Sequence, residues 1–372
     1  MRPSRPISPV LVTGATGFIG SEVVRCLLAS GRPVLTLARA RQGQSAAERV
    51  GAAVGFTPDG WRLNVVEADL TRPGCGFDEL EWRRLCHSVE TVIHCAGDAT
   101  FFPEDMTAFR AAHIDGPVDL LYRLQRHQLR RWIHLSTAYV CGKRSGTVLE
   151  REGDLNQDFH NPYERVKLES EVAIRGAGIR LGIDVRVLRP SIVVGGAPRT
   201  AGGMPSNLFF GFIRLAASLA QPANGTEVSL RIEAAPEARF NIVPLEFVAA
   251  AVVALAEHPD GVGKTFHLVV SDPPTQQAML TMITKRLGLR GLLLVDSLGA
   301  EISSPLERTV ARMLSRYLGY LQQDVRFDDA TTRRLLDRCG LPGPNLSAEA
   351  VNHLIDCALS PVVPFARAHK SE

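Results

Sequence analysis

A glycine-rich stretch near the N-terminus, T-G-A-T-G-F-I-G at residues 13–20, restricts the possible folds more than any other feature of the sequence. It follows an apolar run at Val10–Thr13 that predicts a strand, and it opens a helical pattern at Ser21–Ser30. A structural turn is one interpretation. However, a strand, a glycine turn and a helix N-terminus in this order also form a pyrophosphate site, because glycines let the backbone approach the anion and the first helical turn offers free N–H groups. The spacing is G-x-x-G-x-x-G rather than G-x-G-x-x-G. We therefore expect a dinucleotide to contact Thr13, Gly14, Thr16, Gly17, Phe18, Ile19 and Gly20.

The first half of the chain alternates short apolar runs with helical patterns, which indicates a parallel sheet covered by helices. We therefore expect an α/β fold of the Rossmann type with a doubly wound parallel sheet. The expected strands are Val10–Thr13, Val34–Ala38, Leu63–Glu67, Thr91–His94, Trp132–Ser136 and Val185–Leu188. Helical patterns lie between them, for example at Ser21–Ser30, Glu79–Cys86 and Gly116–His127.

This alternation stops after Pro190. A loop-rich stretch with Gly195, Gly202 and Pro205 precedes an apolar segment at 207–220. The elements expected beyond it are a strand pair at Glu227–Glu233 and Arg239–Ile242, a helix at Leu245–Glu257, a strand at Thr265–Val270, and helices at Gln276–Leu287 and Pro305–Leu321. We expect residues 1–195 to form an NAD(P)-binding domain and residues 196–372 a smaller, mainly helical substrate domain, interlaced with the first through the strands near 240 and 266.

The end of the second expected strand, V-L-T-L-A-R-A-R, bears on the choice of cofactor. An acidic residue there would bind the ribose 2′-hydroxyl of NAD, whereas arginine suits the 2′-phosphate of NADP. Arg39 and Arg41 are present with no nearby Asp or Glu, which favours NADPH over NADH; a solvated Arg in an Arg-rich chain is the alternative. Further residues that follow expected strands are candidates for adenine contact and for the floor of the cofactor site: Asp69 and Leu70, then Cys95, Ala96 and Gly97.

Residues 161–167, N-P-Y-E-R-V-K, combine a helix start with a candidate proton donor. Asn161 can cap the helix, and Glu164 can reach back as in a capping box. Tyr163 and Lys167 then share one helix face, where the ammonium favours the phenolate form of the tyrosine. Lys167 can also hold the nicotinamide ribose, so both residues are expected to contact the cofactor. Thr137 follows the strand Trp132–Ser136, at the sheet edge where open α/β folds bind ligands. Its hydroxyl would hydrogen-bond the substrate oxygen, and Tyr163 would deliver or remove the proton.

Composition excludes several classes of function. The net charge is +3 over 372 residues, and no Lys/Arg run is interleaved with aromatics, so no nucleic acid is expected. The seven cysteines form no C-x-x-C pair and no ligand cluster with His, so we expect reduced thiols, no metal and a cytoplasmic location. No apolar run reaches about 18 residues, so no membrane span is expected. The segment 207–220 is expected in the core or an interface, or as a lid over a lipid-like acyl chain.

Residues about 9–200 resemble the short-chain dehydrogenase/reductase superfamily, extended type, in the motifs T-G-A-T-G-F-I-G, S-T-A-Y-V-C-G and Y-E-R-V-K. Other stretches resemble its thioester reductase and fatty acyl-CoA reductase branch. These are V-V-E-A-D-L-T-R-P (65–73), H-L-S-T-A-Y-V-C-G (134–142), N-P-Y-E-R-V-K-L-E-S-E (161–171), L-R-P-S-I-V-V-G-G (188–196), A-R-F-N-I-V-P-L-E-F-V-A-A-A (238–251) and D-V-R-F-D-D-A-T-T-R-R-L-L (324–336).

The resemblance implies a catalytic triad of Thr137, Tyr163 and Lys167, with Ser136 as a poorer substitute for Thr137. It also implies that the segment Arg189–Val193 lines the nicotinamide end of the site, through Pro190, Ile192 and Val193. One departure is H-I-D-G-P at 113–117, where family members often have N-V-x-G-T. His113 either replaces a structural Asn or alters the proton relay, and we favour the first interpretation.

Modular thioester reductases follow adenylation and carrier domains, whereas no such domain precedes the nucleotide fold in this sequence. The resemblance then implies action in trans on a carrier-bound thioester, an acyl-CoA or a free carbonyl compound, and a homodimer is compatible with it. Two alternatives stay open. One is an NAD(P)-dependent epimerase, dehydratase or hydroxysteroid-type dehydrogenase, since these share the fold and the triad. The other is a non-catalytic cofactor-sensing protein, which the presence of both Tyr163 and Lys167 disfavours.

Overall fold

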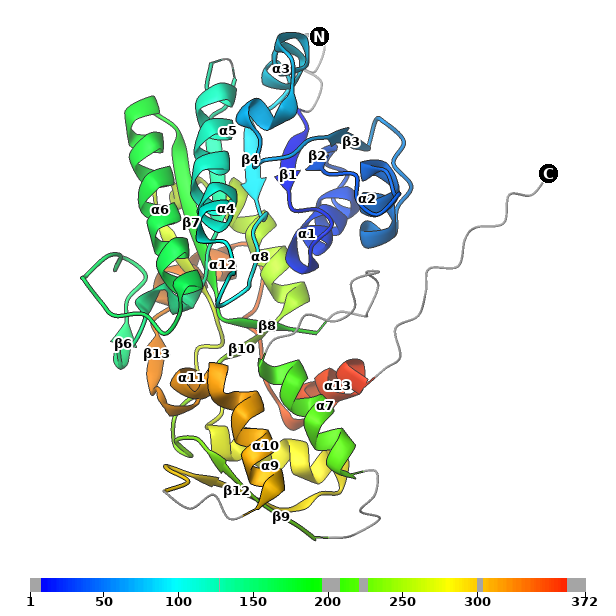
Figure 1. Cartoon of the computed structure of the whole chain (residues 1–372). Helices are drawn as coiled ribbons and strands as arrows, with labels where there is room; N and C mark the ends of the chain where they lie inside the picture. The colour runs from blue at the N-terminus through cyan, green and yellow to red at the C-terminus, as the bar shows by residue number, and fades with distance from the viewer. Residues whose placement is uncertain (1–7, 127, 196–207, 221–226, 300–303, 360–372) are drawn as a thin grey trace, which may run out of the picture.

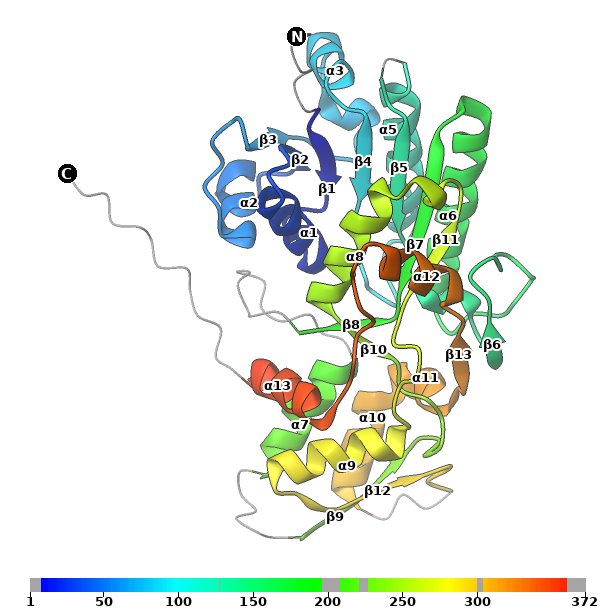
Figure 2. The same cartoon turned by 180° about the vertical axis from the view of Figure 1, so that it is seen from behind.

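The computed structural model describes residues 8–126, 128–195, 208–220, 227–299 and 304–359. Seven parallel strands form the central sheet, in the order β11-β7-β5-β4-β1-β2-β3 (Figures 1 and 2). Their bounds are β1 (Val10–Thr13), β2 (Val34–Ala38), β3 (Leu63–Glu67), β4 (Thr91–His94), β5 (Arg131–Leu135), β7 (Asp184–Pro190) and β11 (Thr265–Leu268). The chain order reverses at β1, which lies between β2 and β4. This switch point is where open α/β sheets bind ligands, beyond the carboxyl ends of the strands.

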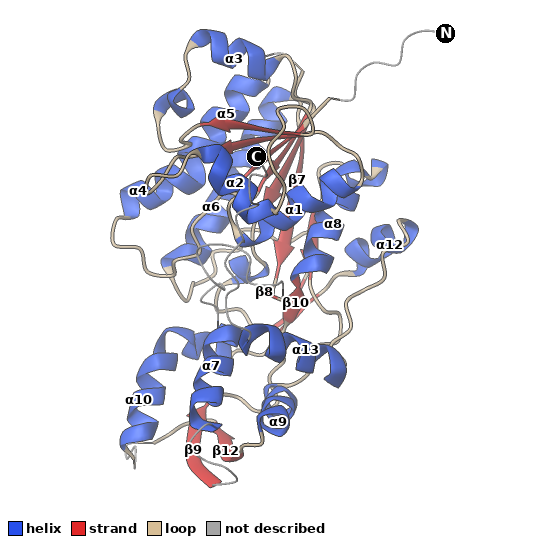
Figure 3. Cartoon of the chain, turned by 90° about the vertical axis from the view of Figure 1, so that its right-hand side faces the viewer, coloured by secondary structure: helices blue, strands red, loops and turns tan. Residues whose placement is uncertain are grey.

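Side chains of the central strands alternate between two hydrophobic layers, as the period of a strand requires. Val10 and Val12 of β1 face one cluster, whereas Leu11 faces the other. The helices α1 (Phe18–Ala29), α2 (Ala46–Val54) and α8 (Leu245–Glu257) contribute to the first cluster, and α3 (Glu79–Cys86), α5 (Gly116–Leu124) and α6 (Pro162–Leu181) to the second. The sheet is therefore buried on both faces, which explains its continuous apolar strands (Figure 3).

The C-terminal half adds a smaller unit beyond the carboxyl ends of the strands (Figures 1 and 2). Its apolar cluster joins α7, α9, α10 and α13 to the parallel pair β9–β12. The bounds are α7 (Leu208–Ala220), β9 (Glu227–Glu233), α9 (Gln276–Leu287), β12 (Arg290–Val295), α10 (Pro305–Leu314) and α13 (Ala348–Leu359). The remaining helices with regular geometry are α4 (Met106–Arg110), α11 (Leu318–Gln322) and α12 (Ala330–Arg338).

Two short parallel pairs connect segments that are far apart in the sequence. β10 (Ile242–Pro244) pairs with β8 (Ile192–Val194), and β13 (Val325–Phe327) pairs with β6 (Gly146–Val148). In addition, β11 extends the central sheet beside β7. The chain therefore returns to the nucleotide-binding half after it has begun the C-terminal half.

The Rossmann-type sheet predicted from the sequence is confirmed, and four of its strands have the predicted bounds. The strand pair expected from Glu227–Glu233 and Arg239–Ile242 is wrong, because β9 pairs with β12 and β10 pairs with β8. The single helix expected at Pro305–Leu321 is also wrong, because α10 ends at Leu314 and a 3-10 turn, Ser315–Tyr317, leads into α11.

Other expectations fall on residues outside the described ranges. These are His127 at the end of the helix after Gly116, and most of the loop-rich stretch between Gly195 and Pro205. The domain boundary expected at residues 195 and 196 adjoins that stretch and stays a prediction. Among the described residues, no helix is both long and apolar enough to cross a membrane.

Candidate active site

A cleft of about 330 Å³ lies where the carboxyl ends of the sheet strands meet the C-terminal half. Four groups of predicted residues share its walls: Gly17, Phe18, Ile19 and Gly20 after β1; Cys95, Ala96 and Gly97 after β4; Ser136 and Thr137 after β5, with Tyr163 and Lys167 of α6; and Pro190, Ile192 and Val193 at the end of β7 and the start of β8. The fold thus brings together segments that span 177 residues of sequence, from 17 to 193.

The glycine loop is close-packed against the backbone around it. Gly14 has a φ of 74°, and a Cβ there would lie 2.6 Å from the backbone nitrogen of Ala96. A Cβ at Gly20 would overlap the carbonyl oxygen of Gly14. Gly17 caps α1 without a side-chain hydrogen bond, and the first turn has no acidic residue. The N–H groups of that turn are thus available to an anion, so this loop fits the pyrophosphate of a dinucleotide.

Thr13 lies beneath the cleft instead of lining it. Its buried Oγ1 is 2.8 Å from Nδ1 of His94 and accepts a hydrogen bond from the backbone N–H of Ala96 at 3.3 Å. Together with Gly14, Thr13 holds the segment after β4 against the glycine loop. Thr16 is half-buried and does not line the cleft either.

The residues predicted to contact the adenosine end lie outside the cleft walls. Arg39 and Asp69 follow β2 and β3, with 3.7 Å between the guanidinium and the carboxylate. Partial burial raises the pKa of Asp69, but the hydrogen bonds from Thr71 and the charge of Arg39 outweigh it and lower that pKa. Arg41 is exposed in the turn after β2, and Leu70 is half-buried. Arg39 is therefore the cation at the end of β2, with one carboxylate already beside it.

Helix α6 begins as its sequence predicts, with one difference in the cap. The side chain of Asn161 accepts a hydrogen bond from the N–H of Glu164 at 3.1 Å, and Pro162 occupies the first turn. The carboxylate of Glu164 accepts from the N–H of His160 at 2.8 Å, one residue before the cap. In a capping box this carboxylate would accept from the N–H of Asn161, whereas here it accepts from the N–H of the preceding residue, His160. The cap fixes the first turn, which carries Tyr163.

Lys167 is buried one turn further along α6. Its Nζ donates a hydrogen bond to the carbonyl oxygen of Leu135 at 2.7 Å, at the end of β5. Burial lowers the pKa of Lys167 to about 8, against the opposing effects of Glu171 and Cys95. The ammonium form therefore predominates at neutral pH, but by a smaller margin than for a lysine in water.

Tyr163 faces the same cleft, with its ring centroid 6.1 Å from that of Phe101. Burial raises the pKa of the phenol, and the negative charges of Glu164 and Asp98 raise it further. The phenol thus carries its proton at neutral pH, which is the form that a proton donor needs.

Thr137 and Ser136 are both buried at the end of β5. The N–H of Ser136 donates to the carbonyl oxygen of Leu188 at 2.7 Å, which fixes this strand end to β7. The hydroxyl of Thr137 accepts a hydrogen bond from the N–H of Tyr139 at 3.3 Å and caps a 3-10 turn, Ala138–Cys141. A hydroxyl that already accepts this bond can still donate its proton to an oxygen in the cleft.

His113 lies on a π-helical turn, Ala111–Asp115, between α4 and α5, and it also lines the cleft. Its Nε2 accepts a hydrogen bond from the backbone N–H of Asp98 at 3.1 Å. Burial and the charge of Lys167 lower its pKa to about 4, so the imidazole is neutral. This contact holds the segment after β4 in place, which agrees with a structural role for the residue.

Several described residues of the cleft were not predicted from the sequence. They are Asp98, Ala99, Phe101, Leu135, Tyr139, Tyr317 and Tyr320, whereas Ser191 and Leu208 belong to segments already singled out from the sequence. Tyr317 and Tyr320 come from the C-terminal half, more than 150 residues after Tyr163. The available signal was a pair of tyrosines three residues apart in a helical pattern, which the sequence alone does not connect to the nucleotide fold.

Tyr320 ties the C-terminal half to the start of α6. Its hydroxyl donates to the carboxylate of Glu164 and accepts from Nδ2 of Asn161, the latter at 2.7 Å. Burial raises the pKa of Glu164 to about 7, against the opposing effects of the Tyr320 hydrogen bond and of Lys143. One wall of the cleft is therefore hydrogen-bonded to the turn that carries Tyr163.

Histidines lie in the core of the sheet as well as at the cleft. His94 and His134 are stacked with 5.5 Å between ring centroids, and burial lowers the pKa of His94 to about 3. Within the described part of the chain, no group of three His, Cys, Asp or Glu side chains is arranged to hold a metal ion.

Comparison with known proteins gives both a family and a fold. The model of the family described as male sterility protein, with an NAD-binding domain, matches residues 12–252. Among curated proteins, the chain is 25% identical over 250 residues to the NRPS-like oxidoreductase fscA of Fusarium equiseti, which covers 65% of this chain and 23% of that protein. It is 25% identical over 294 residues to the carboxylic acid reductase of Mycobacterium tuberculosis, which covers 72% of this chain and 25% of that protein. The chain thus spans about a quarter of the length of these relatives.

Solved structures agree on the fold. The terminal R domain of the myxalamid PKS-NRPS biosynthetic pathway superposes with a TM-score of 0.75 at 22% identity, covering 95% of this chain and 91% of that one. The UDP-glucuronic acid 4-epimerase of Bacillus cereus, in complex with NAD, superposes with a TM-score of 0.67 at 19% identity, covering 94% of this chain and 96% of that one. The family model spans the glycine loop, α6 and the cleft residues as far as Leu208, whereas Tyr317 and Tyr320 lie beyond it. The chain therefore belongs to the male sterility protein family of extended short-chain dehydrogenases/reductases, in the thioester reductase-like branch, and is an NAD(P)H-dependent oxidoreductase.

Proposed function

We propose that this protein uses NADPH to reduce an acyl thioester to an aldehyde, with Tyr163 as the proton donor. The observation that carries the proposal is the convergence, in one cleft, of the free N-terminus of α1 with Thr137, Tyr163 and Lys167. The first is suited to an anionic cofactor, and the others are suited to a carbonyl oxygen that gains charge and then a proton.

The roles of the side chains follow from their protonation. When bound, the reduced nicotinamide supplies the hydride that adds to the carbonyl carbon. Thr137 donates a hydrogen bond to the carbonyl oxygen, and Tyr163, held as the neutral phenol, transfers its proton to that oxygen. Lys167 stabilises the phenolate that is left, since its ammonium lies on the same face of α6.

The atoms balance as a two-electron reduction. Hydride and proton addition to the thioester give a hemithioacetal, in which the new C–H and O–H bonds replace the carbonyl π bond. The C–S bond then breaks, the thiol leaves with a proton, and the aldehyde carbonyl forms. Reduction of the aldehyde to an alcohol would consume a second NADPH in the same cleft.

Preference for NADPH is supported by the end of β2. Arg39 is about half exposed there, and the acidic residue that would bind a ribose 2′-hydroxyl does not follow this strand. Asp69 neutralises part of the charge of Arg39, so we expect NADPH to be preferred without excluding NADH.

Reduction of a thioester is supported by the relatives, which are named as reductases and oxidoreductases, and by the match to a terminal R domain. The cleft also argues against a sugar nucleotide. Among the described residues that line it, Lys167 is the single cationic side chain, whereas the C-terminal half contributes Leu208, Tyr317 and Tyr320. A diphosphate would need further cations or N–H groups at that wall.

We further propose that residues 1–195 bind the cofactor and residues 196–372 bind the substrate. The substrate would reach the cleft on an acyl or peptidyl carrier protein, or as an acyl-CoA, in the cytoplasm. A homodimer would leave this proposal unchanged, because each cleft is built from one chain.

An assay of NADPH and NADH consumption tests the function directly. Acyl-CoA and acyl-pantetheine thioesters should oxidise NADPH and release one thiol per aldehyde formed, detected with a thiol reagent and an aldehyde trap. UDP-sugars, incubated with NAD in parallel, should remain unchanged. Epimerised UDP-sugar with no thioester reduction would refute the proposal and favour the epimerase alternative.

A further inference from the structure

Helix α6 carries a row of ionisable side chains that continues beyond the cleft. Tyr163, Lys167, Glu171 and Arg175 follow one another at intervals of four residues, so each lies on the same helix face as the one before it. Tyr163 and Lys167 line the cleft and have roles in the proposed reaction. Glu171 lies one turn further along, outside the cleft wall, and no step of that reaction involves it.

Glu171 is a buried carboxylate that a guanidinium holds in place. Its two oxygens accept hydrogen bonds from Nε and Nη2 of Arg189, on β7, at 2.9 and 2.6 Å. Both residues border a polar cavity of about 520 Å³, but the side chain of Glu171 is only 3% exposed and that of Arg189 only 2%. Burial raises the pKa of Glu171, but the charge and hydrogen bonds of Arg189 outweigh it and lower that pKa. The carboxylate is therefore ionised at neutral pH, and water screens it little.

Lys167 is a buried cation whose direct partner is uncharged. Its Nζ donates to the carbonyl oxygen of Leu135, and within the described part of the chain no carboxylate forms an ion pair with it. Residues four apart on a helix have about 5–6 Å between their Cβ atoms. A charge at this range acts more strongly in the protein interior than in water. Glu171 can therefore stabilise the ammonium without touching it.

The other groups around Lys167 do not supply this charge. Burial raises the pKa of the thiol and the phenol and lowers the pKa of the imidazoles, so all five are neutral at neutral pH: Cys95, Tyr163, His94, His113 and His134. Asp98 is the single carboxylate among the described residues that line the cleft. Two cations, Arg189 and Arg175, act on Glu171. Burial lowers the pKa of Lys167, and among the surrounding groups Glu171 does most to oppose it.

We propose that Glu171, held by Arg189, is a positioning residue whose negative charge keeps Lys167 positively charged in the cleft. The inference rests on the proposed function for the use of that charge, and it adds to the site a residue that lies behind the cleft wall. If Glu171 served only to join α6 to β7, replacing it would change stability but not the protonation of Lys167.

The protonation of Lys167 can be measured in the whole chain, because the sequence contains only five lysines. Lysine labelled with ¹³C at Cε gives one NMR signal per residue, and the chemical shift of that signal reports the loss of the ammonium proton. The signal that is absent from Lys167→Met identifies this residue. We expect a midpoint near pH 8 in the unmodified protein. In Glu171→Gln we expect about tenfold weaker proton binding, because the opposite charge is lost.

Glu169→Gln is the matched control on the same helix. Glu169 is partly exposed and pairs with Arg110, so its replacement should leave the midpoint of Lys167 unchanged. A double variant, Glu171→Met/Arg189→Met, serves if Glu171→Gln does not fold, because cores often tolerate the replacement of a buried ion pair by apolar side chains. Its midpoint should also be lower, since Glu171 raises the pKa of Lys167 and Arg189 is not among the groups that set it.

The NMR titration separates this inference from the proposed function. A lower midpoint in Glu171→Gln or in the double variant, with no change in Glu169→Gln, supports the inference even where no thioester is reduced and the proposed function fails. If the proposed function holds, the pH above which kcat/KM falls should move down together with the midpoint. An unchanged midpoint in both variants of Glu171, or an equal change in Glu169→Gln, would overturn the inference whatever the activity.

Discussion

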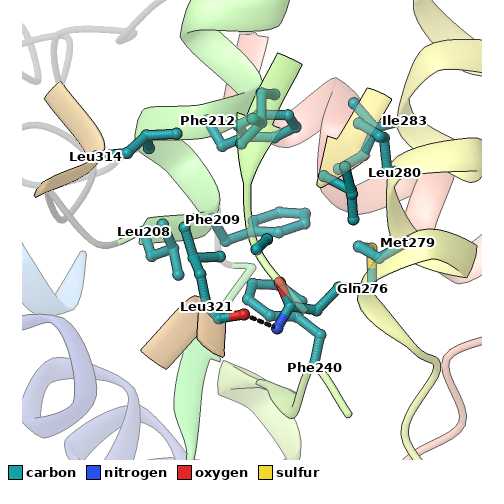
Figure 4. A pocket seen from close by; sticks show the side chains of 13 residues that line it. Leu208, Phe209, Phe212, Phe240, Gln276, Met279, Leu280, Ile283, Leu314 and Leu321 are labelled. Carbon is teal, nitrogen blue, oxygen red and sulfur yellow. Dashed lines mark hydrogen bonds between the residues drawn. The ribbon is translucent and has the colours of Figure 1, made fainter. Parts of the chain in front are cut away.

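The nucleotide-binding half and the C-terminal half form their parts of the site in different ways. In the first, backbone geometry dominates: glycines at 14 and 20 allow close contacts that a Cβ would prevent, and N–H groups of α1 face the cleft. In the second, side chains dominate, with Tyr317 and Tyr320 in the cleft wall and leucines and phenylalanines around a separate cavity of about 50 Å³ (Figure 4). A site built from the backbone suits the dinucleotide cofactor, which every NAD(P) enzyme shares. A wall built from side chains can differ between enzymes that act on different substrates.

The largest effect is expected at the residue that we assign to the chemistry. Tyr163→Phe removes the proton donor and should lower kcat by 10²–10⁴-fold while NADPH still binds, as measured by steady-state kinetics and cofactor fluorescence. Tyr122→Phe is the control, because that hydroxyl accepts hydrogen bonds from Arg180 on the outer helices. Similar activity in both variants would remove Tyr163 from the mechanism.

The glycine loop provides the next comparison between the halves. Gly20→Ala forces a Cβ onto the Gly14 carbonyl, so we expect at least a tenfold loss of NADPH affinity and about 1–3 kcal/mol of stability. Gly211→Ala in α7 has open space around its Cβ and should be neutral or slightly stabilising. Titration of the cofactor and thermal unfolding measure both effects. If Gly20→Ala binds NADPH normally, the close contact is not what shapes the cofactor site.

The pH dependence of activity tests the environment of Lys167. Because burial lowers its pKa to about 8, the ammonium is lost as the pH rises through that value. We expect kcat/KM to fall above pH 8, approaching tenfold per pH unit, while thermal unfolding shows that the protein stays folded. A rate that is constant up to pH 9.5 would mean that the ammonium is not required.

The contact between the two halves predicts a smaller effect, on stability. The pKa of Glu164 is raised from 4.5 to about 7, so the folded state binds the proton more tightly than the unfolded state. This stability is present below about pH 4.5 and is lost as the pH rises to about 7, a difference on the order of 3 kcal/mol. Glu164→Gln should remove that part of the pH dependence, as measured by denaturant unfolding at pH 5 and pH 8. Identical pH dependence in the two proteins would contradict the assignment.

The difference between the halves also explains what the sequence could predict. Strands such as Val10–Thr13 are continuous apolar runs, so this one was predicted with its bounds, and the local glycine motif predicted the turn after it. The helix that follows begins at Phe18, three residues before the expected Ser21. The partner of β9 was not predicted, because β12 lies more than 55 residues further on and its apolar pattern is equally typical of a helix.

The cleft residues divide in the same way. Tyr163 and Lys167 are four residues apart, so helix geometry alone places them on one face. Tyr320 reaches the same cleft through a hydrogen bond to Glu164, 156 residues earlier in the chain. No short sequence motif can predict a contact between residues so far apart in the chain. The segment 207–220 was expected in the core or an interface, or as a lid over an acyl chain, and its helix α7 contributes to the apolar cluster of the C-terminal half.

The central claim, hydride transfer from NADPH to a thioester carbon in this cleft, is tested most directly by isotope transfer. The protein is incubated with octanoyl-pantetheine and NADPH deuterated at both C4 positions, and the trapped octanal is analysed by mass spectrometry. We predict one deuterium at C1 of the aldehyde, one equivalent of free thiol, and neither product from Tyr163→Phe. NADPH oxidation without labelled aldehyde, or labelled aldehyde at the full rate from Tyr163→Phe, would contradict the account.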